Sequence, residues 1–189
     1  MDRVEDKRAA ILNATLRLIS QNGFHGTAMS MVAKEAGVSA GIIYHYFDSK
    51  DALMDELYRH IKRNFGQMIN ESFDQAQPLK IQIREILGQM IRYYIHRPLE
   101  SAFLEQYTRS PYFSSEIEEE VGQYYLPLLE CFQRGQQEMI LKNLPAPVVH
   151  TLTMDVATAL AQKHAAGFLT LTDDLIEQII DACWEAIRQ

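Results

Sequence analysis

The chain has 189 residues, of which 47% are hydrophobic and 10% aromatic, which is ample for one large or two small packed domains. Nothing at the start of the sequence resembles a signal peptide, and no apolar run approaches the roughly 20 residues of a membrane span. We therefore expect a soluble, cytoplasmic protein without a membrane partner.

The formal net charge of −7 by itself disfavours binding to nucleic acid, but the charge is unevenly distributed along the chain. Residues 1–50 hold six Lys and Arg against five Asp and Glu, whereas residues 51–189 hold twelve against twenty. The acidic residues 51–189 repel DNA, whereas the near-neutral residues 1–50 do not. Only residues 1–50 are therefore suited to approach DNA.

Cysteine and histidine spacing gives no sign of a metal site or cofactor. Cys131 and Cys183 lie in apolar helical contexts without a CxxC pattern, which is typical of reduced, buried thiols. The six histidines include no pair four residues apart. We predict no metal and no cofactor.

The first fifty residues read as three helices. Residues 3–22 form an amphipathic helix that ends at Gly23, and Thr27 is the expected N-cap of a short helix that ends at Gly37. Ser39 is placed to cap a second short helix, residues 40–47. Two short helices joined by a tight turn predict a helix-turn-helix.

The exposed face of the second short helix carries Tyr44, His45 and Tyr46, with Gly41 near its start and Lys50 just beyond its end. Hydroxyl, imidazole and ammonium groups donate to phosphate oxygens, and a glycine lets the main chain approach the DNA backbone. The pattern indicates contact with DNA.

This stretch resembles the DNA-binding domain of the TetR (AcrR) family of repressors. The matching positions span about 45 residues, which makes the pattern specific as a whole although any short part of it is weak. They are Ile11, Leu12, Ala14, Leu16, Leu18, Gly23, Phe24, Thr27, Val32, Ala33, Ala36, Gly37, Val38, Ser39, Gly41, Tyr44, Tyr46, Phe47, Ser49, Lys50 and Leu53.

The resemblance implies a homodimer that binds a palindromic operator and releases it when a small-molecule effector binds. It also implies the DNA-contacting residues: phosphate contacts from Thr27, Tyr44, His45, Tyr46 and Lys50, and base-edge proximity for Ser30, Ser39, Ala40, Gly41 and Ile42. Because Ser30, Ala40 and Ile42 offer few bidentate hydrogen bonds, we expect specificity to use thymine methyl groups and DNA shape.

Residues 37–41 also fit G-x-S-x-G, the nucleophile elbow of α/β-hydrolases, with Ser39 as the nucleophile. That motif needs a buried strand immediately before the serine, and a charged helical segment stands there instead. No convergent acid, base or nucleophile is found elsewhere, so no catalytic residue is predicted. A protein-interaction adaptor that keeps the helix-turn-helix shape without DNA affinity stays open as an alternative.

The remaining chain reads as helical, and no strand or hairpin signal occurs. We expect an all-α, nine-helix TetR-like fold, with a head of residues 1–49 and a ligand-binding and dimerisation body of residues 50–189. The expected body helices are 50–75, 79–96, 98–109, 116–141 with a kink at Pro127, 148–168, and 175–188 with Thr172 as N-cap.

The last two helices combine small and large apolar residues, which favours a two-fold bundle with a second copy. The alternative is that the same faces complete the core of one chain. The predicted interface residues are Ala161, Ala165, Ile176, Ile180 and Trp184.

The effector is expected among the long helix that starts at Lys50, residues 79–96, the helix kinked at Pro127 and residues 148–168. Asp155 lies on the same helix face as Thr158. If this face points inward, the Asp155 carboxylate favours a cationic ligand, and if it points outward, the carboxylate is solvated. An apolar or cationic effector is therefore predicted, with Tyr58, Ile61, Phe65, Leu87, Ile91, Tyr94, Phe103, Gln123, Asp155 and Thr158 as candidate ligand-binding residues.

Overall fold

The computed structural model describes residues 2–189, and over these residues the fold is all-α, as predicted. An isolated antiparallel bridge joins Leu141 to Arg188. Within the described part of the chain, no helix is both long enough and apolar enough to cross a membrane. Two compact units are present: residues 2–62 with Ala102–Glu120, and residues 63–101 with Val121–Gln189. The functional boundary between residues 49 and 50 stays a prediction.

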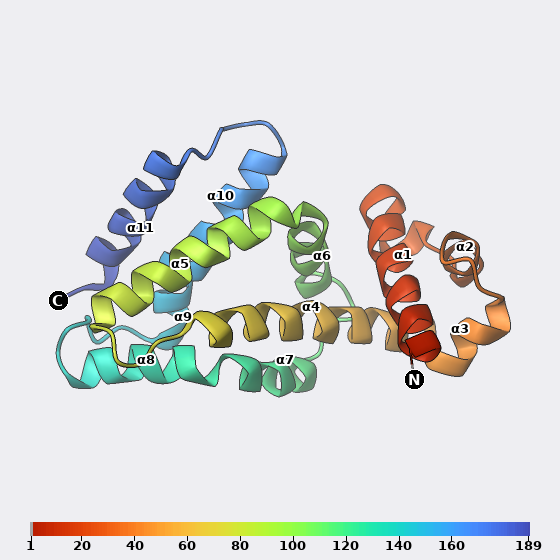
Figure 1. Ribbon diagram of the computed structural model, residues 1–189, viewed down its shortest axis with the longest axis horizontal. Coiled ribbons are helices and arrows are strands. Elements are labelled where there is room, and N and C mark those ends of the chain that lie inside the picture. Colours follow the sequence, from red (N-terminus) through yellow and green to blue (C-terminus); the bar gives the residue numbers. More distant parts are fainter. Residues whose placement is uncertain (1) are drawn as a thin grey trace. The chain divides into compact units, whose positions relative to one another are not determined.

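The first unit begins with three helices (Figure 1). They are α1 (Asp2–Gly26), α2 (Met29–Glu35) and α3 (Ala40–Tyr46), followed by the start of α4 (Lys50–Ser72), the end of α6 (Pro98–Thr108) and the start of α7 (Ser115–Gly122). Helix α2 packs on α1, and α3 packs on α2. Their shared core contains Ile11, Val32, Ile43 and Phe47, each at most 4% exposed.

The end of α1 differs in detail from the prediction. Gly23 has φ of 67°, which breaks the helical path where a break was expected, but one more turn follows to Gly26. The prediction that Thr27 caps α2 is wrong, because the N-cap is Ala28 and makes no side-chain cap bond. The Thr27 hydroxyl donates instead to the carbonyl oxygen of Gly23, at 2.8 Å.

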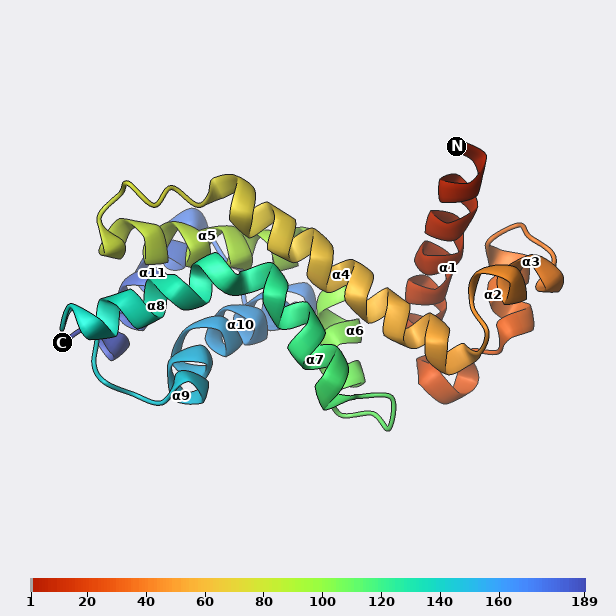
Figure 2. The same cartoon turned by 90° about the horizontal axis from the view of Figure 1, so that it is seen from below.

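The second unit contains the rest of α4, α6 and α7 and five further helices (Figure 2). These are α5 (Leu79–His96), α8 (Leu126–Gln137), α9 (Ala146–His150), α10 (Val156–Ala165) and α11 (Asp173–Ile187). Helix α5 packs against α8, α10 and α11. As predicted, Thr172 caps α11, its hydroxyl accepting from the Leu175 amide.

Two predicted helices contain irregular turns. The helix expected over residues 116–141 is interrupted, as predicted. The interruption is a 3-10 turn, η1 (Gln123–Tyr125). Pro127 lies just after it, in the first turn of α8, where its missing N–H breaks no helical bond. The helix expected over residues 148–168 contains a π turn, η2 (Thr151–Asp155), between α9 and α10. Counting α7 with α8 and α9 with α10, residues 2–189 form the nine predicted helical segments.

Helix α4 approaches η1 closely at Gly66. A β-carbon at Gly66 would lie 2.6 Å from Cβ of Tyr124 and 2.9 Å from its carbonyl oxygen. The Asn70 side-chain amide donates to the same carbonyl, at 3.3 Å. Glycine at this position is therefore required by space and not by backbone conformation.

Candidate nucleic-acid interface

Helix α3 is held in place by local capping and by one buried face. Gly37 adopts φ of 65° in the turn, and the Ser39 hydroxyl accepts a bond from the Ile42 amide, at 3.4 Å. Ile43 is fully buried and Phe47 is 4% exposed, so the opposite face of α3 is left toward solvent. The capping role predicted for Ser39 is confirmed.

The solvent face of α3 contains most of the predicted DNA contacts. Ala40, Gly41, Tyr44 and His45 are exposed, with Tyr44 at 53%. Ile42 and Tyr46 are half-buried, and Ser30 on α2 and Ser39 in the turn are exposed. The arrangement presents small residues at the start of the helix and hydrogen-bonding rings at its end.

Two other predicted contacts point into the protein. Thr27 is 1% exposed, and its hydroxyl is bonded to the carbonyl of Gly23. The Lys50 ammonium donates to the carbonyl of Phe24, so it satisfies one of the carbonyls at the end of α1. Both side chains hold the connection between α1 and α2.

Two exposed residues of α2 were not among the DNA contacts predicted from the sequence. Met31 is 37% exposed, and Lys34, three positions later, is also exposed. A lysine four residues after Ser30 lies on the same helix face, which is the signal that would have found it. The nearby carboxylate of Glu35 is paired with Arg17, at 3.0 Å, which reduces its repulsion of DNA.

The hydrolase alternative at Ser39 lacks the structure that it needs. The segment before the serine is helix α2 and its C-terminal turn, and the Ser39 hydroxyl caps α3. A nucleophile elbow requires a strand at that place.

Tyr58 and Tyr107 bind the start of α4 to the end of α6 inside the first unit. Both are fully buried, and their rings stack with centroids 4.3 Å apart. Tyr107 donates to Asp55, at 2.8 Å, and Tyr58 donates to Glu118. Burial, followed by the bond to Asp55, raises the pKa of Tyr107 above its usual value, so the phenol stays neutral.

The predicted ligand-binding residues are divided between the units. Tyr58, Ile61 and Phe103 belong to the first unit, and Phe65, Leu87, Ile91, Tyr94, Gln123, Asp155 and Thr158 belong to the second. In the second unit, Phe65 contacts Tyr93, Tyr94 and Tyr125 with ring centroids 5.3 to 5.7 Å apart. Gln123 is exposed, and the half-buried Thr158 donates to the Met154 carbonyl.

Asp155 lies at the surface, which is the solvated alternative. Its side chain is 56% exposed, accepts a bond from Thr151 at 2.9 Å, and lies 3.2 Å from Nδ1 of His150. The carboxylate therefore does not supply a buried negative charge for a ligand.

Four of the five predicted interface residues lie in the core of the single chain. Ala161, Ile176, Ile180 and Trp184 are between 1% and 5% exposed, whereas Ala165 is exposed. Side chains that are already buried cannot provide an open contact face. The alternative that they complete the core of one chain holds for these four.

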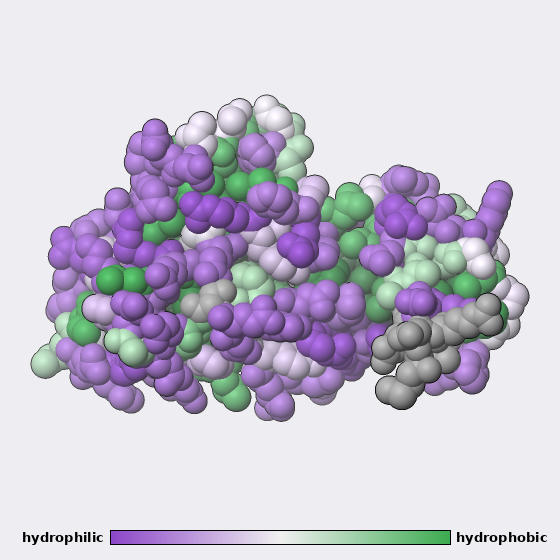
Figure 3. Space-filling view, viewed as in Figure 1, coloured by the Kyte–Doolittle hydropathy of each residue, from purple (hydrophilic) through white to green (hydrophobic). Residues whose placement is uncertain are grey.

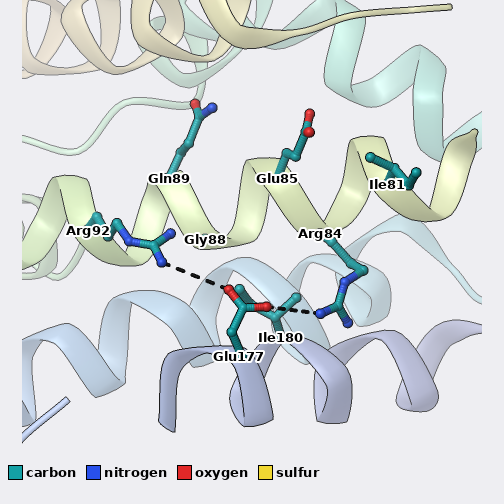
Figure 4. Close-up of a pocket in the computed structure, with 8 residues that line it drawn as sticks. All are labelled: Ile81, Arg84, Glu85, Gly88, Gln89, Arg92, Glu177 and Ile180. Carbon is teal, nitrogen blue, oxygen red and sulfur yellow. Dashed lines mark hydrogen bonds and ion pairs between the residues drawn. The ribbon is translucent and has the colours of Figure 1, made fainter. Parts of the chain in front are cut away.

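A charged groove follows the seam between α5 and α11 (Figure 4). Glu177 lies between Arg84, at 3.0 Å, and Arg92, at 3.9 Å, and Arg84 also pairs with Asp181. Gly88 lies between the two arginines, and a β-carbon there would approach Cδ1 of Ile180 to 3.2 Å. The groove is a helix seam in which both arginines and Glu177 are ion-paired within the chain.

Comparison with known proteins agrees with this geometry. A family described as bacterial regulatory proteins, tetR family, matches residues 11–57, and one described as tetracyclin repressor-like, C-terminal domain, matches residues 78–188. An HTH-type transcriptional regulator of Haemophilus influenzae is 28% identical over 184 residues, 97% of each chain.

Two solved structures share the whole fold. A TetR family transcription regulator from Marinobacter aquaeolei superposes with a TM-score of 0.95 at 26% identity, covering 100% of this chain and 98% of that one. A TetR family protein from Vibrio parahaemolyticus gives 0.82 at 30% identity, covering 97% and 99%. The chain thus belongs to the TetR family of transcriptional regulators, with a helix-turn-helix DNA-binding domain at its N-terminal end.

Proposed function

We propose that the protein represses transcription by binding a two-fold-symmetric operator as a homodimer and releases it when a small apolar effector binds. The observation that carries the proposal is the face of α3, on which Ala40, Gly41, Tyr44 and His45 are exposed while Ile43 is fully buried. A capped helix of this kind enters the major groove in helix-turn-helix proteins.

The exposed residues divide into two kinds of contact. Tyr44, His45 and the half-buried Tyr46 are suited to donate to phosphates, and Lys34 adds a cation on α2. Ala40, Gly41 and Ile42 come near base edges and favour contact with thymine methyl groups and readout of DNA shape. Thr27 and Lys50 act indirectly, by holding the end of α1 through the carbonyls of Gly23 and Phe24.

The proposed dimer uses a second apolar stripe that the core leaves open. On α11, Leu175, Ile179, Ala182 and Ala186 recur at intervals of three and four and are exposed or half-buried. Val156, Ala159 and Ala166 lie along α10 and its C-cap at intervals of three and seven, with the exposed Lys163 between the last two. Figure 3 shows white and light green surface near the top, with green patches below it. Phe168, in the α10–α11 connection, is 83% exposed. Small residues on such a stripe let paired helices approach closely.

The proposed effector binds in the second unit, next to the buried residues Phe65, Leu87, Ile91 and Tyr94. Aromatic and aliphatic walls favour an apolar ligand. A cationic effector loses its support because Asp155 is solvated.

Fluorescence anisotropy with a labelled duplex tests DNA binding and separates it from the adaptor alternative. Affinity for duplex should fall steeply as salt rises, because phosphate contacts release counterions. Replacing Tyr44 by Phe should weaken binding by about 0.5–1.5 kcal/mol through loss of one hydrogen bond. Tyr124→Phe, at a half-buried tyrosine of the second unit, is the matched control. Absence of saturable, salt-dependent binding would favour the adaptor.

A further inference from the structure

A second groove lies in the first unit, where the C-terminal ends of α1 and α6 meet. It has a volume of about 600 Å³, within the range of roughly 300–1,000 Å³ typical of small-molecule sites. Gly23, Phe24 and His25 line it from α1, and Glu105 and Arg109 line it from α6 and the residue after it. It is separate from the buried residues of the second unit that we assign to the effector.

The backbone gives this groove a negative field. Helix α6 ends at Thr108, and the C-terminal end of a helix carries partial negative charge. The end of α1 adds little, because Lys50 neutralises the Phe24 carbonyl and Thr27 occupies that of Gly23. The carboxylate of Glu105 adds a full negative charge at the same place, with 42% of its side chain exposed. Once Arg109 is displaced from Glu105, these two sources favour a positively charged occupant over an anion.

The cation that now neutralises Glu105 is easily displaced. Arg109 Nη1 lies 2.8 Å from Glu105 Oε1, and the arginine side chain is 78% exposed. An exposed pair four residues apart in sequence is among the weakest ion pairs in proteins, because both charges are solvated before they pair. A ligand cation can therefore replace the guanidinium at little cost.

Phe24 supplies an aromatic surface for such a ligand. Its ring is fixed by contacts with Phe103 and Tyr112, with centroids 5.7 and 5.3 Å away. Its carbonyl is held by Lys50. The half-buried ring thus stays in place in the groove that Glu105 also lines, and cations bind favourably over aromatic faces.

We propose that this groove binds a small organic cation with a planar apolar body, such as an aromatic amidinium or ammonium compound. The charged group pairs with Glu105 in place of Arg109, and the apolar body covers Phe24. The site requires no DNA and no second copy, so it stands independently of the proposed regulatory mechanism.

NMR titration of the full chain with benzamidinium tests the proposal, with neutral benzamide and anionic benzoate as matched probes. Benzamidinium should cause saturable amide shifts in residues 22–25 and 105–111, and the other two probes should bind more weakly. Shifts confined to other residues, or equal binding of benzamide, would show that no cation site exists here.

Three variants test the roles of Glu105 and Arg109 in benzamidinium binding. Glu105→Gln should weaken benzamidinium binding roughly threefold to fivefold, the effect of one exposed charge pair. Arg109→Ala should strengthen it roughly twofold, because it removes the competing cation. Glu177→Gln, which changes a half-exposed, arginine-paired carboxylate in the second unit, is the control and should change nothing. If the variants keep their thermal stability, unchanged benzamidinium affinity in Glu105→Gln or weaker affinity in Arg109→Ala overturns the proposal. Benzoate binding that is abolished by Arg109→Ala would identify an anion site instead.

Discussion

Glu100 shows how a single residue combines burial with hydrogen bonding. Its side chain is 17% exposed, accepts a bond from the Tyr93 hydroxyl at 2.8 Å, and lies 3.7 Å from Nε of Arg97. Burial raises the pKa of Glu100, and this outweighs the lowering by Tyr93 and Arg97. A raised pKa means that folding favours the protonated acid, so stability from this group is present at low pH and is lost as the carboxylate ionises.

Glu100→Gln should therefore change stability in a pH-dependent way. Glutamine keeps an acceptor for Tyr93 and cannot ionise, so the variant should gain stability relative to the wild type as pH rises above about 4.3, the ordinary glutamate pKa. Urea unfolding at a series of pH values measures this. A stability advantage of Glu100→Gln over the wild type that shrinks with rising pH would contradict the raised pKa of Glu100.

At the scale of helices, two of the three capping residues predicted from local sequence were right, and Thr27 was wrong because its hydroxyl bonds to the carbonyl of Gly23. Ser39 and Thr172 cap the helices that they were predicted to cap, and Gly37, where the first short helix was expected to end, adopts a left-handed conformation. The turns η1 and η2 were not predicted, because an irregular turn inside a helix depends on the elements packed around it.

Helical periodicity also shows which residues share a face without showing which face the core covers. Ile180 and Trp184 were assigned to an interface and lie in the core, at 2% and 5% exposure. The stripe through Ile179, about 100° around the same helix, is the one left open. Asp155 was left undecided for the same reason, and only the packing of its helix places it outside.

Gly66 gives a test of helix packing in which two effects have opposite signs. Alanine gains about 0.5–1 kcal/mol of helix propensity over glycine, but its β-carbon would overlap Tyr124. Overpacking costs about 1–3 kcal/mol, so Gly66→Ala should lower stability despite the better propensity. Gly122→Ala, where a β-carbon meets nothing within 4 Å, should be neutral or stabilising. Chemical denaturation measures both, and a more stable Gly66→Ala would show that α4 is not packed this closely.

At the scale of the whole molecule, assembly is the step on which operator binding depends. Ile179→Glu should place a charge in the proposed interface and give folded monomers, because Ile179 is only half-buried within one chain. Gln178→Glu makes a comparable change at an exposed neighbouring position and should leave the dimer intact. Sedimentation velocity with circular dichroism distinguishes the outcomes. A dimer that survives Ile179→Glu places the interface elsewhere.

The most direct test of the account is selection of bound sequences from a pool of random duplex DNA. A dimer that presents two α3 helices should enrich a palindrome whose half-site centres lie about one helical turn, 34–36 Å, apart. Ile179→Glu should enrich single half-sites or lose enrichment, whereas Gln178→Glu should select the same palindrome as the wild type. No enrichment by the folded wild-type protein, or enrichment of an asymmetric site without repeated half-sites, would contradict symmetric operator binding.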